Sequence, residues 1–271
     1  MKTNIKIIFG CLLAVSLATV AYGCKGKASN SDNATDTVAT VKPVGPTFNA
    51  DSAYAFTAAQ CDFGPRVMNS AAHDKCGKWI VEKFKEYGCD VQEQKADLKA
   101  YDGTVLKSTN IIARFNPEAK KRILICAHWD SRPWADNDPD STNHKKPVMA
   151  ANDGASGVAV MLELARQLQA DKKLKVGVDF VCFDAEDWGI PSWETRYPNA
   201  DDSWALGAQY YAKNFPTAVK PEFGILLDMV GGEGAQFYRE GMSVQFAPDV
   251  VNRVWEAAKA AGFGSYFPDA I

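Results

Sequence analysis

The chain has 271 residues, of which 46% are hydrophobic, and it carries 30 Lys and Arg residues against 33 Asp and Glu residues. This size and hydrophobic content are enough for one large domain with a buried core, and they exclude a disordered chain, a fibrous protein and a disulfide-stapled miniprotein. The charge balance provides no basic surface of the kind that binds nucleic acid, so nucleic acid is not an expected partner.

Residues 1–23 have the pattern of a secretory signal peptide, in which two lysines precede an apolar run at 7–20. That run is too short for a typical transmembrane helix. The next segment, 24–46, is rich in Ser, Asn, Thr, Ala and Lys, a composition typical of a flexible tether. Cys24 follows a small residue, as in the cleavage site of a bacterial lipoprotein. We therefore expect an exported protein on the periplasmic face, anchored to a membrane through a lipid on Cys24.

The rest of the chain, 47–271, alternates helical and extended patterns without an internal repeat. Because strands alternate with helices, we predict a single α/β domain with three layers, α/β/α, around a mixed, mainly parallel sheet. The first two strands, joined by a short turn, should form an antiparallel hairpin at one side. The spacing of apolar residues predicts helices at Ser52–Gln60, Ala71–Tyr87, Ala155–Gln169, Ser203–Asn214 and Asp249–Ala261, and strands at Asp90–Ala100, Val105–Phe115, Arg122–Ala127, Val176–Phe183 and Phe223–Leu227.

Five cysteines remain outside the signal peptide and position 24. An odd number in an exported protein cannot all pair within the chain. Cys126 and Cys182 lie inside apolar strands, where a buried free thiol is the usual outcome. The sequence leaves two pairings open, Cys61 with Cys76 or Cys76 with Cys89.

Three of the predicted core strands end in polar residues. His128 follows the first of them, the acids of FDAED (183–187) follow the second, and Asp228 follows the third. Open α/β sheets place ligands outside the carboxyl ends of their strands, so these residues should converge. Asp153, just before a predicted helix, is a fourth contributor. Carboxylates crowded as closely as those of FDAED repel each other unless a cation or a proton lies among them.

One histidine and several carboxylates form a nitrogen and oxygen ligand set suited to Zn²⁺. Adjacent Glu186 and Asp187 cannot easily reach one ion together, so one should bind the metal and the other should transfer protons.

Each of these residues also has an ordinary alternative role. Asp153 could cap the helix that follows, Asp184 could be a turn acid, and His128 could be a hydrogen-bonded structural histidine. His73, at a helix start, and His144, in a polar loop, are expected to be solvated and not catalytic.

The motifs AHWDS (127–131), NDGASGVAVMLELAR (152–166), FDAED (183–187) and LLDM (226–229) resemble, in this order, those of the zinc aminopeptidase and glutaminyl cyclase superfamily. Within it, HWDSRPWADND and LLDMVGGEGAQF look most like bacterial glutaminyl-peptide cyclotransferases. The resemblance runs from Ala53 to the end of the chain. It implies a zinc enzyme that cyclises the N-terminal glutamine of peptides or proteins to pyroglutamate and releases ammonia.

The resemblance also implies roles for individual residues. Asp153 and Asp187 would bind zinc, Glu186 would transfer protons, and Asp228 would lie beside the reacting amide. Many relatives have Glu at the position of Asp187. The family has a further histidine ligand after the helix at 249–261, which this sequence lacks, so we expect a catalytic domain truncated at its C-terminus with an incomplete zinc site.

Trp129 and Trp193 are expected to wall the substrate pocket, although Trp193 could equally be a core or surface residue. A tryptophan-rich rim would favour cyclisation, because it could crowd out a second metal ion. The first alternative is a two-zinc aminopeptidase, in which Asp153 bridges the ions, His128 and Asp228 hold the second one, and Glu186 activates water. The other alternative is a lipoprotein that binds peptides without catalysis.

Overall fold

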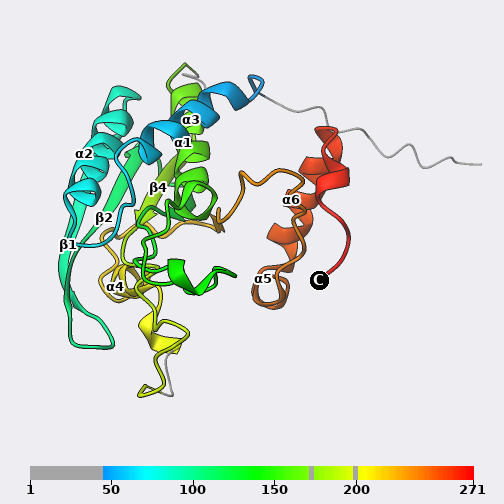
Figure 1. The fold of residues 1–271 in the computed structure, drawn as a ribbon. Helices are drawn as coiled ribbons and strands as arrows, with labels where there is room; N and C mark the ends of the chain where they lie inside the picture. The colour runs from blue at the N-terminus through cyan, green and yellow to red at the C-terminus, as the bar shows by residue number, and fades with distance from the viewer. Residues whose placement is uncertain (1–44, 171–173, 198–200) are drawn as a thin grey trace, which may run out of the picture. The chain divides into compact units, whose positions relative to one another are not determined.

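The computed structural model describes residues 45–170, 174–197 and 201–271 (Figure 1). The predicted signal peptide, Cys24 and nearly all of the predicted tether lie outside these ranges. The described residues group into one compact unit. Among the described residues, no helix is long and apolar enough to cross a membrane.

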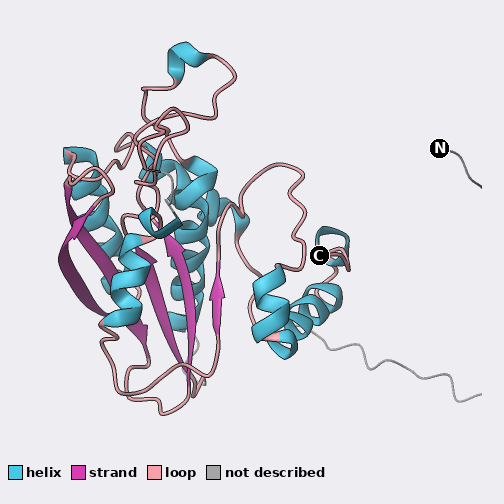
Figure 2. Cartoon of the chain, turned by 90° about the horizontal axis from the view of Figure 1, so that it is seen from below, coloured by secondary structure: helices cyan, strands magenta, loops and turns pink. Residues whose placement is uncertain are grey.

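A five-stranded sheet with the order β1-β2-β4-β3-β5 forms the middle of this unit (Figure 2). The hairpin of β1 and β2 is antiparallel and lies at one edge, as predicted, and β2 is also antiparallel to β4. The parallel pairings join β3 to β4 and to β5. The predicted mixed sheet is therefore confirmed, and its parallel part consists of the three strands that end in the candidate site. The strands are β1 Asp90–Lys99, β2 Val105–Phe115, β3 Arg122–His128, β4 Gly177–Phe183 and β5 Gly224–Leu226.

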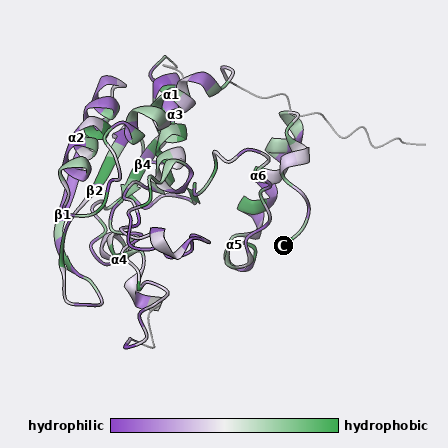
Figure 3. Cartoon of the chain, in the orientation of Figure 1, coloured by the Kyte–Doolittle hydropathy of each residue, from purple (hydrophilic) through white to green (hydrophobic). Residues whose placement is uncertain are grey.

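Helices cover both faces of the sheet, which confirms the three layers. On one face α2 and α3 pack against the strands, and α1 packs on α3, while α4 lies on the other face. The strands alternate between the two layers: in β4, Phe180 belongs to the core beneath α2 and α3, whereas Val181 belongs to the core beneath α4. The hydropathy colouring shows apolar residues along β2 (Figure 3). The helices are α1 Ala50–Cys61, α2 Ala71–Glu86, α3 Ser156–Ala170, α4 Leu206–Lys213, α5 Gly241–Phe246 and α6 Pro248–Ala260.

One helix boundary differs from the prediction for a physical reason. The helix expected from Ser203 begins at Leu206, because 201–203 form a 3-10 turn and Ala205 has a left-handed backbone with φ of 53°. A left-handed residue cannot continue an α-helix. The short helix α5 was not predicted. Neither of the two cysteine pairings forms, since all five described cysteines are free.

Candidate metal centre

Side chains from four separate segments meet at the carboxyl ends of β3, β4 and β5. His128 ends β3, and its Nε2 lies 2.8 Å from Asp153 Oδ1 and 3.6 Å from Asp228 Oδ1. One possible ligand atom from each of His128, Asp153 and Asp187 lies within 4.8 Å of the others. The predicted convergence is therefore confirmed. One imidazole nitrogen and two carboxylate oxygens form a donor set that fits a divalent ion such as zinc.

Asp153 is presented by an irregular turn directly before α3. Its backbone is not helical, with φ of −86° and ψ of 98°, and Gly154 has φ of 101°. A Cβ atom on Gly154 would lie 2.9 Å from the carbonyl oxygen of Asp130 and 3.1 Å from His128 Cε1, so only glycine fits there. The Asp153 carboxylate contacts His128 instead of a helix N–H, which decides against the capping alternative.

Arg66, which the sequence analysis missed, holds the approach to this turn. It is fully buried, and its two terminal nitrogens donate to the carbonyls of Met149 and Ala150 at 2.6 and 2.7 Å. Ala150 has a left-handed φ of 56°. The buried guanidinium thus fixes the strained backbone from which the Asp153 turn starts.

The N-terminus of α4 forms backbone hydrogen bonds with the acidic segment that follows β4. The backbone N–H groups of Ala205, Leu206 and Gly207 donate to the carbonyls of Glu186, Ala185 and Asp184, each at 3.0 Å. Ala185 has a left-handed φ of 52°. A Cβ atom on Gly207 would lie 2.0 Å from the Asp184 carbonyl oxygen, so this close approach requires glycine.

Asp130, two residues after His128, joins the histidine to the acidic segment. Its carboxylate is fully buried and accepts the backbone N–H groups of Glu186 and Asp187 at 3.0 and 3.1 Å. The same carboxylate lies 3.5 Å from His128 Nδ1. Asp130 therefore positions three residues of the centre at once. This role of Asp130 was not predicted, although its place in AHWDS was a usable signal.

Asp184 and His73 form a buried pair below the centre. His73 Nε2 lies 2.9 Å from Asp184 Oδ1, and Asp184 Oδ2 accepts the backbone N–H of Thr109 at 2.6 Å. Asp184 is thus a structural acid, one of the two roles left open for it. The expectation of a solvated His73 was wrong, because its ring is 2% exposed and stacks on Trp129 with 4.1 Å between centroids.

His144 was also expected to be solvated, and it is only partly exposed. It is half-buried, its Nε2 lies 2.8 Å from the carbonyl oxygen of Asp138, and its ring stacks on Trp193 at 6.2 Å.

The acids of the centre have displaced pKa values. Burial raises the pKa of Glu186 to about 7, and burial together with the charge of Asp130 raises the pKa of Asp187 to about 8. Burial would lower the pKa of His128, but hydrogen bonds with Asp130 and other carboxylates outweigh it and raise this pKa well above its ordinary value.

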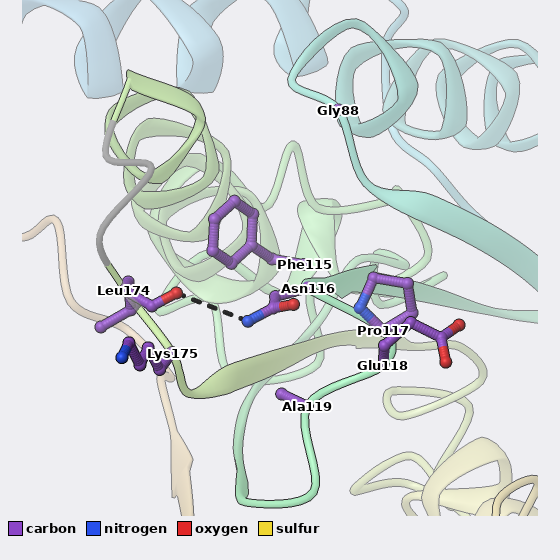
Figure 4. Close-up of a pocket in the computed structure, with 8 residues that line it drawn as sticks. All are labelled: Gly88, Phe115, Asn116, Pro117, Glu118, Ala119, Leu174 and Lys175. Atoms are coloured by element: carbon purple, nitrogen blue, oxygen red, sulfur yellow. Dashed lines mark hydrogen bonds between the residues drawn. The ribbon is translucent and has the colours of Figure 1, made fainter.

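Two of the cavities on the described surface differ in how they lie relative to the centre. The larger, about 610 Å³, is lined by residues such as Phe115, Asn116 and Lys175 and contains none of the candidate ligands (Figure 4). The smaller cavity, of about 260 Å³, is lined by Asp153, by Asp187 and by residues of the segment that follows β3, such as Trp134. The smaller cavity is the one that adjoins the candidate chemistry.

The two predicted pocket tryptophans differ in position. Trp129 is 1% exposed and packs in the core beside Gly77, so its assignment to the substrate pocket was wrong. Side chains alternate along an extended segment, so Trp129 points away from the side on which His128 lies. Trp193 is 43% exposed, and its ring lies 6.1 Å from that of Trp134, which lines the smaller cavity. The pocket role of Trp193 stays a prediction.

Comparison with known proteins agrees with this geometry. The solved structure of glutaminyl cyclase from Bacteroides thetaiotaomicron, bound to N-acetylhistamine, is 49% identical and superimposes with a TM-score of 0.81 over 84% of this chain and 77% of that one. A solved structure from Parabacteroides distasonis, described as a Zn-dependent exopeptidase, is 50% identical, with a TM-score of 0.81 and the same coverage. Glutaminyl-peptide cyclotransferase from Drosophila melanogaster is 27% identical over 64% of this chain, and the match spans 47% of that protein.

The chain thus spans about half the length of this curated relative. Residues 110–270, which contain every candidate ligand described above, match the sequence pattern of peptidase family M28. Together with the solved structures at about 50% identity, this match shows that the chain belongs to peptidase family M28.

Proposed function

We propose that the protein is a zinc-dependent glutaminyl-peptide cyclotransferase, which converts the N-terminal glutamine of peptides or proteins into pyroglutamate and releases ammonia. The observation that carries the proposal is the position of Glu186. Burial raises the pKa of this carboxyl group to about 7, and the group interacts electrostatically with His128, Asp153 and Asp228. The similarity to solved glutaminyl cyclases supports the same reaction.

Zinc is the cofactor that the donor set fits best. Asp153 and Asp187 would hold the ion, and His128 is the third donor within reach. The related structure described as a Zn-dependent exopeptidase supports this choice of metal. When bound, zinc supplies Lewis acidity toward the side-chain carbonyl of the substrate.

Glu186 is the residue suited to move the proton. The substrate's α-amine attacks the side-chain carbonyl carbon, a new C–N bond closes the ring, and the amide C–N bond breaks. Glu186 takes a proton from the amine and delivers it to the departing nitrogen, which leaves as ammonia. A group that both accepts and returns a proton works best with a pKa near the operating pH, and the value of about 7 meets this condition.

Asp228 is placed to bind the substrate amide. Its side chain is 43% exposed at the end of β5, on the far side of His128 from the buried Asp130. From there its carboxylate can accept an N–H of the glutamine amide. Because the attack is intramolecular, the main task of the site is to hold the substrate in its folded, reactive shape.

A two-zinc aminopeptidase is the second candidate function. This reaction would use four of the same side chains, namely those of His128, Asp153, Glu186 and Asp228. One of the similar structures is described as a Zn-dependent exopeptidase. Metal stoichiometry separates the two reactions, because hydrolysis in this form requires two tightly bound ions per chain and cyclisation requires one.

The test is an assay of the purified full-length protein on Gln-peptides and on aminoacyl anilides, each with and without a chelator. We expect ammonia from the Gln-peptides, no anilide cleavage, loss of activity with the chelator and recovery with added zinc. The Glu186→Gln variant should bind the peptide without releasing ammonia. Anilide cleavage by a protein with two zinc ions would support the aminopeptidase, and peptide binding without either reaction would support the non-catalytic alternative.

We further propose that the protein is exported and held at the periplasmic face by a lipid on Cys24. The support is the sequence of residues 1–46, with its signal-like start and polar tether. Metabolic labelling with a fatty-acid analogue tests this proposal. The wild-type protein should carry the label and the Cys24→Ser variant should not, whereas equal labelling of the two would refute the anchor.

A further inference from the structure

Arg132 and Asp136 form a two-pronged ion pair in the segment after β3. Arg132 Nε donates to Asp136 Oδ1, and Nη2 donates to Oδ2, both at 2.6 Å. The side chains are only 12% and 4% exposed. A bidentate pair of this kind fixes the plane of the guanidinium as well as its position.

The remaining nitrogen of this guanidinium reaches the metal centre. Arg132 Nη1 donates to the carbonyl of Asp187 at 3.0 Å and lies 3.4 Å from that of Gly189. Arg132 therefore binds the backbone carbonyl of a candidate metal ligand, Asp187, whose backbone N–H donates to Asp130.

Arg132 also contacts Trp134, the aromatic residue that lines the smaller cavity. Its guanidinium carbon lies 4.6 Å from the ring centroid of Trp204 and 5.5 Å from that of Trp134. Trp134 lines the cavity and meets Trp188 edge to face at 5.5 Å. Cation–π contacts hold an aromatic ring at a fixed distance from the charge.

Asp136 extends the same connection to a third segment. Its Oδ2 accepts the backbone N–H of Ser192 at 2.8 Å, and its carbonyl accepts the Ser192 hydroxyl at 3.1 Å. The next residue, Trp193, lies against Trp134. This one ion pair thus contacts the backbone of Asp187, the ring of Trp134 and the backbone of Ser192, which precedes Trp193.

We propose that the Arg132–Asp136 pair is a positioning pair that fixes Asp187 and Trp134 relative to each other, and that it thereby sets which side chain the cavity accepts. The proposal rests on the proposed function for the identity of the substrate. Trp134, Val148 and Ala150 give this cavity an apolar wall next to the ligands. The residue that follows the N-terminal glutamine would place an apolar or aromatic side chain there.

Two variants test the pair, and one matched variant is the control. Arg132→Lys keeps the charge and removes the planar fork, and Asp136→Asn keeps the shape and removes the charge. The control is Arg196→Lys, because Arg196 makes a similar two-pronged pair with Glu194 but has a side chain that is 76% exposed.

Two readouts do not depend on turnover. We expect both variants to bind zinc more weakly by about 10-fold or more in competition with a chromophoric chelator, because they disturb the support of a ligand. We also expect a smaller near-ultraviolet circular dichroism signal from the coupled rings of Trp134 and Trp188. The control should match the wild-type protein in both measurements.

The substrate readout is the ratio of kcat/KM for Gln-Phe peptides over Gln-Ala peptides. It should fall by about 2- to 30-fold in Arg132→Lys, as expected when a cation–π contact that holds the wall is lost. If the wild-type protein releases no ammonia from either peptide, the proposed function fails, while zinc affinity and circular dichroism still decide the positioning role.

The proposal is overturned if Arg132→Lys and Asp136→Asn unfold at lower temperature but keep wild-type zinc affinity and the wild-type tryptophan signal. The pair would then be a structural ion pair without influence on the centre. Should both variants fail to fold, Asp136→Glu carries the same test, because it keeps the charge of the pair and displaces the carboxylate that Arg132 and the Ser192 N–H contact. Unchanged values in that variant would equally count against the proposal.

Discussion

Replacement of Asp130 by Asn tests how the acidic residues of the metal centre are held. Asp130 accepts one backbone N–H from Glu186 and one from Asp187, and it lies 3.5 Å from His128 Nδ1. Asparagine has one carbonyl oxygen and one amide NH₂ group in place of the two carboxylate oxygens. At least one of the two buried N–H groups therefore loses its acceptor and faces a donor.

The size of the effect follows from these contacts. A buried donor left without a partner costs about 1–3 kcal/mol of unfolding free energy. For a domain of this size, that corresponds to a fall in Tm of about 2–12 °C. Loss of the negative charge also relieves repulsion with Asp187. In the wild-type protein, however, hydrogen bonds to Asp130 outweigh the cost of burial and hold its pKa below the ordinary value. The surroundings therefore stabilise the charged form of Asp130, and we expect its loss to destabilise the protein.

The assay compares zinc affinity and Tm of Asp130→Asn with those of Asp97→Asn. Asp97 is an exposed acid paired with Lys107 and makes a matched control. We expect zinc affinity to fall about 10- to 100-fold in Asp130→Asn, as for other residues that orient metal ligands, and to stay unchanged in the control. If Asp130→Asn binds zinc as tightly as the wild-type protein, Asp130 does not position the ligands and the account of this centre is wrong.

Further predictions concern catalysis and stability. Glu186→Gln should lower kcat about 10²- to 10⁴-fold with little change in KM, as measured by ammonia release, and an unchanged kcat would exclude Glu186 as the proton carrier. Because Glu186 must be ionised to accept a proton and burial raises its pKa to about 7, kcat/KM should fall as the pH drops below about 7, and the positive charge of bound zinc should shift this limb to lower pH. A profile that is flat from pH 8 to 4 would contradict this assignment. Gly207→Ala should cost about 1–3 kcal/mol in urea unfolding, because the new Cβ atom would lie 2.0 Å from the Asp184 carbonyl oxygen, and full stability in that variant would show that the backbone can move aside.

Local patterns predict much of the fold and the place of the site. The periods of two and 3.6 residues identify the core strands and their covering helices, and the polar residues at the strand ends identify the edge where ligands lie. His128, Asp153 and Asp187 meet there as predicted. The same alternation along β3 could have excluded Trp129 from the pocket, because consecutive side chains of an extended segment point to opposite sides.

Contacts between distant segments account for what the sequence did not predict. His73 and Asp184 are 111 residues apart in the chain, and Asp130 and Asp187 are 57 apart, so no local pattern relates them. The left-handed backbone at Ala185 follows no propensity, since alanine rarely adopts it, and it is stabilised by bonds from α4 that exist only in the folded chain.

The zinc content of the purified protein and of the Asp153→Asn/Asp187→Asn double variant tests the central claim most directly. Measured by mass spectrometry under native conditions, the wild-type protein should carry one zinc ion per chain, and the double variant should be folded and zinc-free. A double variant that keeps its zinc would show that these acids do not form the metal centre.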